Sequence, residues 1–136
     1  MKFFKYVSTG NDFVLLEPGS WELSMLPDLA RKLCPRRFGV GADGLLVIGP
    51  DLVLRMFNPD GTEDFCGNGL ACAALHAVTQ GWAGDCFELE HFGRQVTVRR
   101  TDQGFEIGLG KADFRPEHVP VSSESEWFDL QIGRAH

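Results

Sequence analysis

The stretch from Asn58 to Gln80 constrains the fold of this chain more than any other. It begins with Asn-Pro-Asp-Gly, in which the proline fixes one φ angle and the glycine permits a positive one, as turns require. After Cys66 and a Gly-Asn-Gly sequence, every residue from Leu70 to Val78 except His76 is apolar or small. A helix that is apolar on all sides is normally buried. We therefore expect a buried central helix with a sheet wrapped around it.

Short apolar and alternating segments on both sides of this helix predict strands. A second helix is expected at 27–34, where apolar residues recur at helical spacing and Pro35 follows. The segments after the central helix alternate at short spacing, as antiparallel strands do. The chain is therefore predicted to be an α+β domain, in which a mostly antiparallel sheet is rolled around a long central helix. We expect about eight strands, at residues 2–7, 13–16, 45–48, 52–57, 86–90, 95–100, 105–109 and 128–132.

Composition and charge exclude several classes of function. With 136 residues, 43% of them hydrophobic and 24% charged, the chain is long enough and apolar enough to fold as one domain. Its net charge of −6 argues against a nucleic-acid partner, because such proteins need clustered positive charge. No apolar run approaches the roughly 20 residues that span a bilayer, so we expect no membrane partner. The four cysteines do not suggest a small disulfide-rich protein, and we expect reduced thiols and a cytoplasmic location.

Cys66 lies where the central helix is expected to begin. The positive end of the helix dipole and the unpaired N–H groups of a first helical turn both stabilise a thiolate at such a position. Gly67 and Gly69 leave those N–H groups uncovered, which suits a carboxylate or another anion. Two interpretations are open on local sequence alone. Cys66 is either an inert helix cap or a base beside the binding site of a small carboxylated substrate.

The other chemistry-bearing residues give weaker signals. No close pair of cysteine or histidine ligands is present, so no metal site is predicted. The glycine-rich stretch 38–44 precedes a strand, whereas a dinucleotide-binding loop must open a helix. The remaining cysteines are interpreted as small core residues. The four histidines are interpreted as surface residues or as hydrogen-bonded buried ones: His76, His91, His118 and His136.

Four motifs occur in the order and at about the spacing of one known family. They are Gly-Asn-Asp-Phe at 10–13, Phe-Gly-Val-Gly-Ala-Asp-Gly at 38–44, Phe-Asn-Pro-Asp-Gly-Thr-Glu at 57–63 and Cys-Gly-Asn-Gly at 66–69. In this arrangement the chain resembles diaminopimelate epimerase, nearly to its last residue, over the first half of that family's length. The resemblance implies two similar domains, each a sheet rolled around a central helix. It also implies an amino-acid epimerase that needs no pyridoxal phosphate or other cofactor.

The resemblance implies roles for individual residues. Cys66 would be one of two cysteines that face the substrate, one removing the α-proton while the other delivers a proton to the opposite face. Gly67 and Asn68 would contact the α-amino-acid head of the substrate, and Asn11 and Asn58 would be further substrate contacts. For the last two, the local sequence offers the alternative that Asn11 is a hairpin-tip residue and Asn58 a turn residue.

Some positions depart from the family pattern. Gly44 stands where some members have a substrate-contacting glutamine and others a glycine, and His136 is a looser match to a family histidine. Ala71 stands where the family usually has an arginine. Loss of that arginine removes a charge from the start of the helix, so the substrate or the activity can differ.

The domain assignment follows from the same resemblance. Residues 1–125 are expected to form one epimerase domain, and residues 126–136 to begin the crossover to a second domain that is missing. We expect half of a diaminopimelate epimerase, which converts L,L- to meso-diaminopimelate, and expect it to be inactive alone.

Three alternatives stay open. The chain is a non-enzymatic domain that binds a small carboxylate or docks to a partner, or it is a related amino-acid racemase or epimerase with another substrate. In the third, two copies form a homodimer that shares one site. The expected partners are therefore an amino-acid substrate and either a second epimerase domain or a second copy.

Overall fold

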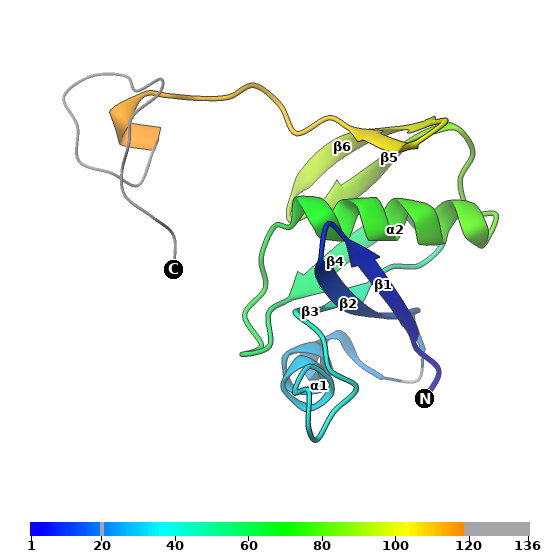
Figure 1. The fold of residues 1–136 in the computed structure, drawn as a ribbon, viewed down its shortest axis with the longest axis vertical. Helices are drawn as coiled ribbons and strands as arrows, with labels where there is room; N and C mark the ends of the chain where they lie inside the picture. Colours follow the sequence, from blue (N-terminus) through cyan, green and yellow to red (C-terminus); the bar gives the residue numbers. More distant parts are fainter. Residues whose placement is uncertain (20, 119–136) are drawn as a thin grey trace.

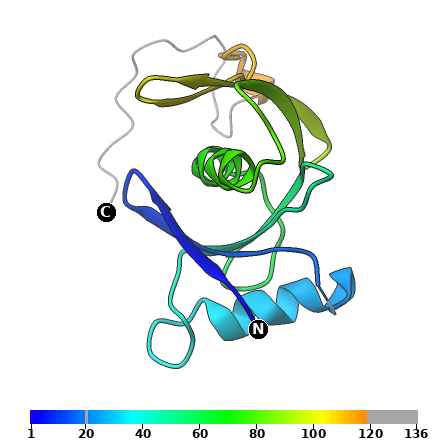
Figure 2. The same ribbon diagram turned by 90° about the vertical axis from the view of Figure 1, so that its right-hand side faces the viewer.

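The computed structural model describes residues 1–19 and 21–118. The described chain forms one seven-stranded sheet, whose strands lie in sequence order, together with two α-helices and two short 3₁₀ helices. Figure 1 shows the arrangement, and Figure 2 shows that the sheet curls around α2 while α1 lies on its outer side. The elements are β1 (Phe4–Ser8), β2 (Asn11–Leu16), η1 (Leu23–Met25), α1 (Leu26–Leu33), β3 (Gly44–Val47), β4 (Val53–Phe57), α2 (Gly67–Thr79), β5 (Cys86–His91), β6 (Arg94–Thr101), β7 (Gly104–Ile107) and η2 (Pro116–His118).

The sheet is mixed, so the prediction of a mostly antiparallel sheet is wrong. β2 pairs with β3 in parallel, and β4 pairs with β5 in parallel. A parallel pair needs a crossover connection between its strands, and α1 and α2 lie within these two connections. The other neighbouring strands are antiparallel, as the alternating segments predicted for β5, β6 and β7. Alternation within a segment describes which face is buried, and it does not reveal the direction of the neighbouring strand.

The prediction of a long central helix is also wrong, because α2 has only 13 residues. The helix does lie inside the curve of the sheet, as Figure 2 shows. One side of α2 is not buried: Leu75 is 45% exposed and Ala71 is half-buried. The sequence appeared apolar on all sides because alanine and glycine serve on both the packed and the open sides of this helix.

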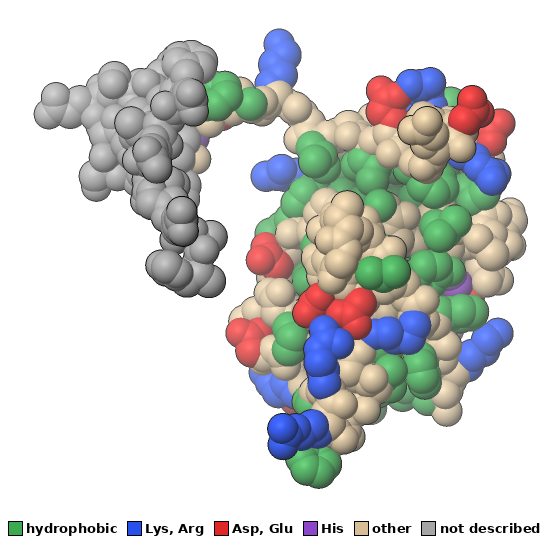
Figure 3. Space-filling view, in the orientation of Figure 1, with side chains coloured by type: hydrophobic (Ala, Val, Ile, Leu, Met, Phe, Trp, Pro, Cys, Tyr) green, Lys and Arg blue, Asp and Glu red, His purple; other side chains and the backbone are tan. Residues whose placement is uncertain are grey.

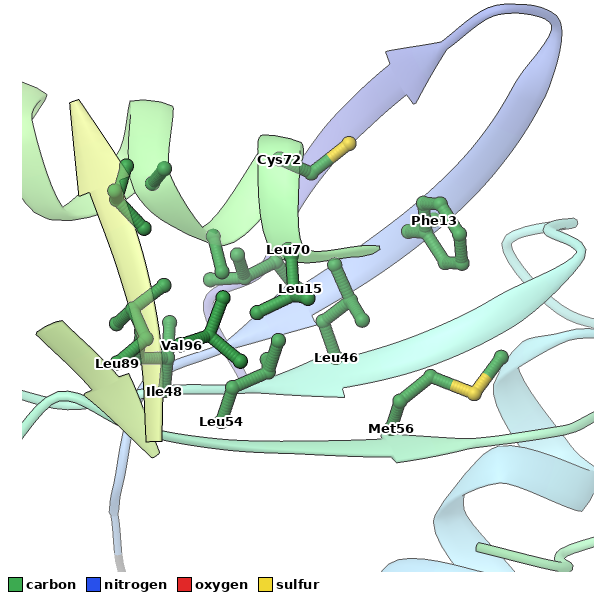
Figure 4. Close-up of a cluster of buried hydrophobic side chains, with 13 residues drawn as sticks. Phe13, Leu15, Leu46, Ile48, Leu54, Met56, Leu70, Cys72, Leu89 and Val96 are labelled. Atoms are coloured by element: carbon green, nitrogen blue, oxygen red, sulfur yellow. The ribbon is translucent and has the colours of Figure 1, made fainter. Parts of the chain in front are cut away.

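The main core fills the space between α2 and the concave face of the sheet. Figure 4 shows Leu70 of α2 pointing toward Leu15 and Leu46, which come from β2 and β3. All three side chains are fully buried. Leu89 and Val96 extend the same cluster onto β5 and β6. Burial of these side chains supplies the main driving force for docking α2 on the sheet.

A second core lies between the convex face of the sheet and α1. Val14 and Leu16 of β2 belong to it, together with Ala30 and Leu26 of α1. Because β2 is covered on both faces, its apolar residues are continuous rather than alternating. α1 itself begins one residue before the predicted range, with Pro27 in its first turn.

His76 is the polar residue at the centre of α2. It is fully buried, and its two ring nitrogens make hydrogen bonds with the Tyr6 hydroxyl at 2.8 Å and with the Glu17 carboxylate at 2.9 Å. The interpretation of this residue as a hydrogen-bonded histidine is confirmed. Burial also raises the pKa of Tyr6. These bonds fix the middle of α2 to β1 and to the segment after β2.

Two further expectations concern the chain as a whole. All four cysteines are free thiols. No helix in the described part of the chain is both long and apolar enough to cross a membrane. The strand expected at 128–132 and the crossover expected at 126–136 lie outside the described residues.

Leu70 and Leu75 provide a matched test of the core on one helix. We expect Leu70→Ala to lower the free energy of unfolding by about 2 to 5 kcal/mol, because it opens a cavity between α2 and the sheet. Leu75→Ala should change it by less than about 1 kcal/mol, since that side chain is 45% exposed. Urea unfolding followed by circular dichroism measures both values. Equal losses in the two variants would contradict the described position of α2.

Candidate functional site

Cys66 is the N-cap residue of α2. Its backbone is extended, with φ −141° and ψ 114°, and the helix begins at the next residue. The Sγ atom accepts a hydrogen bond from the N–H of Gly69 at 3.3 Å, and the Cys66 carbonyl accepts from the N–H of Leu70 at 3.0 Å. The side chain is half-buried. Cys66 therefore lies at the helix start that the sequence predicted, with its sulfur turned back onto the first turn.

The first turn of α2 keeps two N–H groups without a protein partner. The amides of Gly67 and Asn68 donate to no acceptor among the described residues. Such orphan groups at a helix start are normal binding positions for a carboxylate, and the helix dipole adds to the attraction. Gly67 and Asn68 directly follow Cys66 in the sequence. The site therefore combines a thiol with two fixed N–H donors.

The two glycines of the Cys-Gly-Asn-Gly motif lie in different surroundings, and only one of them is required by packing. A Cβ on Gly69 would lie 3.0 Å from Leu46 Cδ2 and 3.4 Å from Cys66 Cβ, so Gly69 is needed for the close packing of α2 on β3. A Cβ on Gly67 would meet only Leu109 Cδ1, at 3.9 Å. Gly67 is therefore not required by packing, and its small size leaves the adjoining N–H groups open.

The tip of the β1–β2 hairpin reaches the same end of α2. Thr9 and Gly10 both have positive φ angles, 50° and 80°, as a two-residue turn between paired strands requires. The Thr9 hydroxyl donates to Asn68 Oδ1 at 3.1 Å. This bond connects the Gly-Asn-Asp-Phe and Cys-Gly-Asn-Gly motifs. Asn11, the residue after the turn, is half-buried, and its side-chain amide has no hydrogen-bond partner among the described residues.

An ionic network joins the Gly-Asn-Asp-Phe motif to the glycine-rich loop. The Arg36 guanidinium contacts Asp12 at 2.8 Å and Asp43 at 3.1 Å, and Lys5 contacts Asp12 at 2.8 Å. The N–H of Asp12 donates to the Asp43 carboxylate, and the N–H of Asp43 donates to the Asp12 carbonyl. Arg36 and then Lys5 hold the pKa of Asp12 well below its usual range. The network fixes the strand start that carries Asn11.

Figure 3 shows acidic and basic side chains lying side by side on one face of the molecule. The sequence analysis missed the roles of Asp12 and Asp43, although both stand in quoted motifs. The available signal was that the motifs at 10–13 and 38–44 each contain an aspartate, while lysine and arginine occur elsewhere in the chain. It was weak because these residues lie up to 38 positions apart, Lys5 from Asp43, and only the fold brings them together.

Asn58 occupies a tight turn at the end of β4. Its backbone N–H donates to the Thr62 carbonyl at 2.8 Å, and its Nδ2 donates to the Thr62 hydroxyl at 3.1 Å. This agrees with the alternative that Asn58 is a turn residue. The amide oxygen of Asn58 keeps no hydrogen-bond partner among the described residues, so it remains an available acceptor.

Gly44 and His136 were the two looser candidates. Gly44 is buried at the start of β3, where a Cβ would lie 2.9 Å from Met56 Cε and 3.2 Å from the Phe57 carbonyl. Packing therefore explains this glycine. His136 lies outside the described residues.

The sequence analysis interpreted His91 only as a surface or a hydrogen-bonded buried histidine, and the structure places it, buried and hydrogen-bonded, beside Cys66. The backbone N–H of Cys66 donates to His91 Nε2 at 3.0 Å, and His91 Nδ1 is hydrogen-bonded to the Leu54 carbonyl at 3.0 Å. Burial lowers the pKa of His91. Its position at the end of a strand, 25 residues after Cys66, gave no sequence signal of this contact.

A pocket lies beside Phe65, two residues before α2 begins. It has a volume of about 350 Å³ and is lined by Phe65, Leu109 and Arg94 among others, with the Arg94 guanidinium over the Phe65 ring. A larger pocket of about 520 Å³ lies over β5, β6 and β7 and contains none of the candidate residues. Within the described ranges, no group of three His, Cys, Asp or Glu side chains is placed to hold a metal ion.

Solved structures share this curled sheet around a helix. A Bacillus anthracis phenazine biosynthesis protein of the PhzF family superposes with a TM-score of 0.56 at 17% identity, over 77% of this chain and 37% of its own. The PhzF-family phenazine biosynthesis protein of Enterococcus faecalis gives a TM-score of 0.53 at 14% identity, over 71% of this chain and 36% of its own. These likenesses define the class of fold.

Sequence comparison identifies the family within that class. The family model for diaminopimelate epimerase matches residues 3–114. The chain is 33% identical to the diaminopimelate epimerase of Methanothrix thermoacetophila, over 97% of this chain and 52% of the relative. It is 37% identical to that of Moorella thermoacetica, over 88% of this chain and 45% of the relative. The chain belongs to the diaminopimelate epimerase family, a family of isomerases, and the predicted family is confirmed. It spans about half the length of these relatives.

Asp12→Asn tests the ionic network. Because the folded state lowers the pKa of Asp12, the stability it contributes is present above its unfolded pKa of about 4 and is lost as the pH falls further. We expect the variant to be less stable than the parent at about pH 7, and the difference to shrink toward about pH 3. Urea unfolding at both pH values measures this.

The control is Asp85→Asn, because Asp85 is exposed and its side chain makes no ion pair among the described residues. It should leave stability unchanged at both pH values. A difference between Asp12→Asn and the parent that is independent of pH would contradict the assigned role of the carboxylate.

Proposed function

We propose that this chain is the N-terminal half of a diaminopimelate epimerase, in which Cys66 exchanges the α-proton of the substrate. The observation that carries the proposal is the thiol at the N-cap of α2 beside the N–H groups of Gly67 and Asn68, which lack protein partners within the described ranges. An α-hydrogen is a very weak acid, so its removal needs fixed dipoles where negative charge develops on the carboxylate. The two N–H groups supply those dipoles, and the sulfur accepts or delivers the proton.

We assign substrate contacts to polar atoms that have no hydrogen-bond partner among the described residues. Asn68 Oδ1 is occupied by Thr9, which leaves the amide nitrogen to donate to a substrate carboxylate. Asn11 keeps both its donor and its acceptor, and Asn58 keeps its acceptor. Gly67 contributes its backbone N–H alone. We assign these residues to substrate binding, and we assign no such role to Gly44, which packing explains.

A complete reaction needs a second proton carrier on the opposite face of the α-carbon. We propose that it comes from a second epimerase domain, with residues 1–125 forming the first domain and 126–136 beginning the crossover. The half-length match to the relatives supports this division. The chain alone should then be inactive, and exchange of solvent deuterium into the α-position of L,L-diaminopimelate by the chain alone would contradict that. The four free thiols agree with a cytoplasmic location.

Ala71 supports a second candidate, a related epimerase or racemase with another substrate. Its side chain is half-buried and lines a pocket of about 420 Å³ with Tyr6, Cys72 and Leu75. The arginine expected here from the family resemblance would place a cation in that pocket. Without it, an anionic group of the substrate has one contact fewer on this side.

Alkylation of the cysteines tests the assignment of Cys66. With iodoacetamide near neutral pH, we expect Cys66 to react at least about three times faster than Cys86, because N–H donation to sulfur favours the thiolate. Cys86 is exposed and serves as the reference thiol of the same chain. Peptide mass spectrometry quantifies each site separately. Diaminopimelate should slow the reaction at Cys66 and leave Cys86 unchanged.

Two controls sharpen this experiment. L-Lysine lacks one carboxylate of diaminopimelate and should protect Cys66 less. Cys66→Ser should abolish the fast-reacting site while Cys86 keeps its rate. Equal rates at Cys66 and Cys86 in the parent chain would contradict an activated thiol at the start of α2.

The open side of the sheet predicts self-association of the isolated chain. β1 and β7 are its two edge strands, and the pocket between them exposes Val7, 67% exposed, and Leu75. Unpaired strand edges with apolar side chains favour association. We expect the sedimentation coefficient to rise with concentration, and Val7→Lys to reduce the effect. Phe92→Lys is the control, since Phe92 is 52% exposed on the β5–β6 turn. A monodisperse monomer at high concentration would contradict the prediction.

A further inference from the structure

His91 links the candidate thiol to the sheet. It is the last residue of β5 and is only 1% exposed. One ring nitrogen, Nε2, accepts the N–H of Cys66 at 3.0 Å. The other, Nδ1, is 3.0 Å from the carbonyl of Leu54 on β4. The imidazole therefore spans from the middle of the sheet to the N-cap of α2.

The two partners define the protonation state of the ring. A backbone N–H can only donate, so Nε2 carries no proton. A carbonyl can only accept, so Nδ1 carries the proton. His91 is thus a neutral imidazole in one defined tautomer. A protonated ring would place a second N–H against the N–H of Cys66, which removes that hydrogen bond.

One face of the His91 imidazole is covered by Phe65. The Phe65 ring stacks on the imidazole at 4.9 Å between centroids and 25° between planes. The Arg94 guanidinium lies over Phe65, 5.1 Å from its centroid. Phe65 immediately precedes Cys66, so His91 holds two consecutive residues, one by stacking and one by a hydrogen bond.

We propose that neutral His91 is a positioning residue for Cys66, which holds the N-cap conformation that turns the sulfur onto the first turn of α2. The proposal rests on the proposed role of Cys66 in proton transfer. The extended backbone of Cys66 is what allows its sulfur to accept from the Gly69 N–H. Because His91 fixes the amide on one side of that residue, loss of the ring hydrogen bond frees the cap to rotate.

The inference includes a pH dependence with a definite sign. Burial is the largest influence and lowers the pKa of His91, whereas the hydrogen bond to the Leu54 carbonyl and the charges of Glu63 and Asp64 act in the opposite direction. The Arg94 guanidinium lies over the Phe65 ring and is a cation that faces this stack. The neutral ring, and the hydrogen bond to Cys66, are therefore intact above the unfolded pKa of about 6.5 and are lost as the pH falls through the folded value.

Two variants separate positioning from packing. His91→Phe keeps an aromatic ring beside Phe65 and removes both hydrogen bonds. His91→Gln keeps one acceptor and one donor on a side chain that does not titrate. We expect alkylation of Cys66 near neutral pH to slow by about three- to tenfold in His91→Phe and to remain within about twofold of the parent in His91→Gln. Cys86 is the reference thiol in each sample.

Val98→Ala controls for general destabilisation. Val98 is buried in the main core on β6 and makes no contact that the argument uses, so the variant should lose stability while Cys66 keeps its rate. If Val98→Ala slows Cys66 as much as His91→Phe does, or if His91→Phe leaves the rate unchanged, the positioning role is refuted.

Nitrogen-15 NMR of the histidine rings supplies a readout that is independent of reactivity. We expect His91 to show a protonated Nδ1 and an unprotonated Nε2, and a coupling through the hydrogen bond to the Cys66 amide. The Cys66 amide resonance should shift as His91 titrates in the parent chain and should lose that transition in His91→Gln. A protonated Nε2 at neutral pH would refute the inference, whereas an unreactive Cys66 with this tautomer in place would refute only the proposed function.

Discussion

The backbone N–H groups at the start of α2 need hydrogen-bond acceptors, and residues of the candidate site supply some of them. A helix start leaves its leading N–H groups without intrahelical acceptors. Here the Cys66 sulfur takes the N–H of Gly69, and His91 takes the N–H of Cys66 itself. The N–H groups of Gly67 and Asn68 are left over among the described residues. The same physical requirement that fixes the thiol therefore produces the open donors that an anionic substrate needs.

The fold brings distant segments to this helix end. The β1–β2 hairpin carries Thr9 to Asn68, and the network around Asp12 joins that hairpin to the loop before β3. The parallel pairs matter here, because each helix connection returns the chain in the same direction along the sheet. Motifs separated by tens of residues in the sequence are thereby tied into one set of contacts.

Local chemistry in the sequence predicted the helix start, the cysteine at its cap and the polar hairpin tip. These features depend on neighbouring residues, so a single sequence contains them. The parallel pairing of β4 with β5 could be inferred only by noticing that a helix separates the two strands. The contacts of His91 with Cys66 and of Arg36 with Asp12 could not be inferred, because each joins residues 25 or 24 positions apart through the curvature of the sheet.

The junction between β4 and β5 is narrow, with two paired residues against six between β5 and β6. It divides the sheet into β1 to β4, where α1 packs on β2, β3 and β4, and a meander, β5 to β7. His91 stands at this junction and bonds to Leu54 on one side and Cys66 on the other. His91 and the Arg94–Phe65 contact therefore both connect the meander to the residues at the start of α2. A change in how the meander packs against β4 would therefore alter the contacts that hold Cys66.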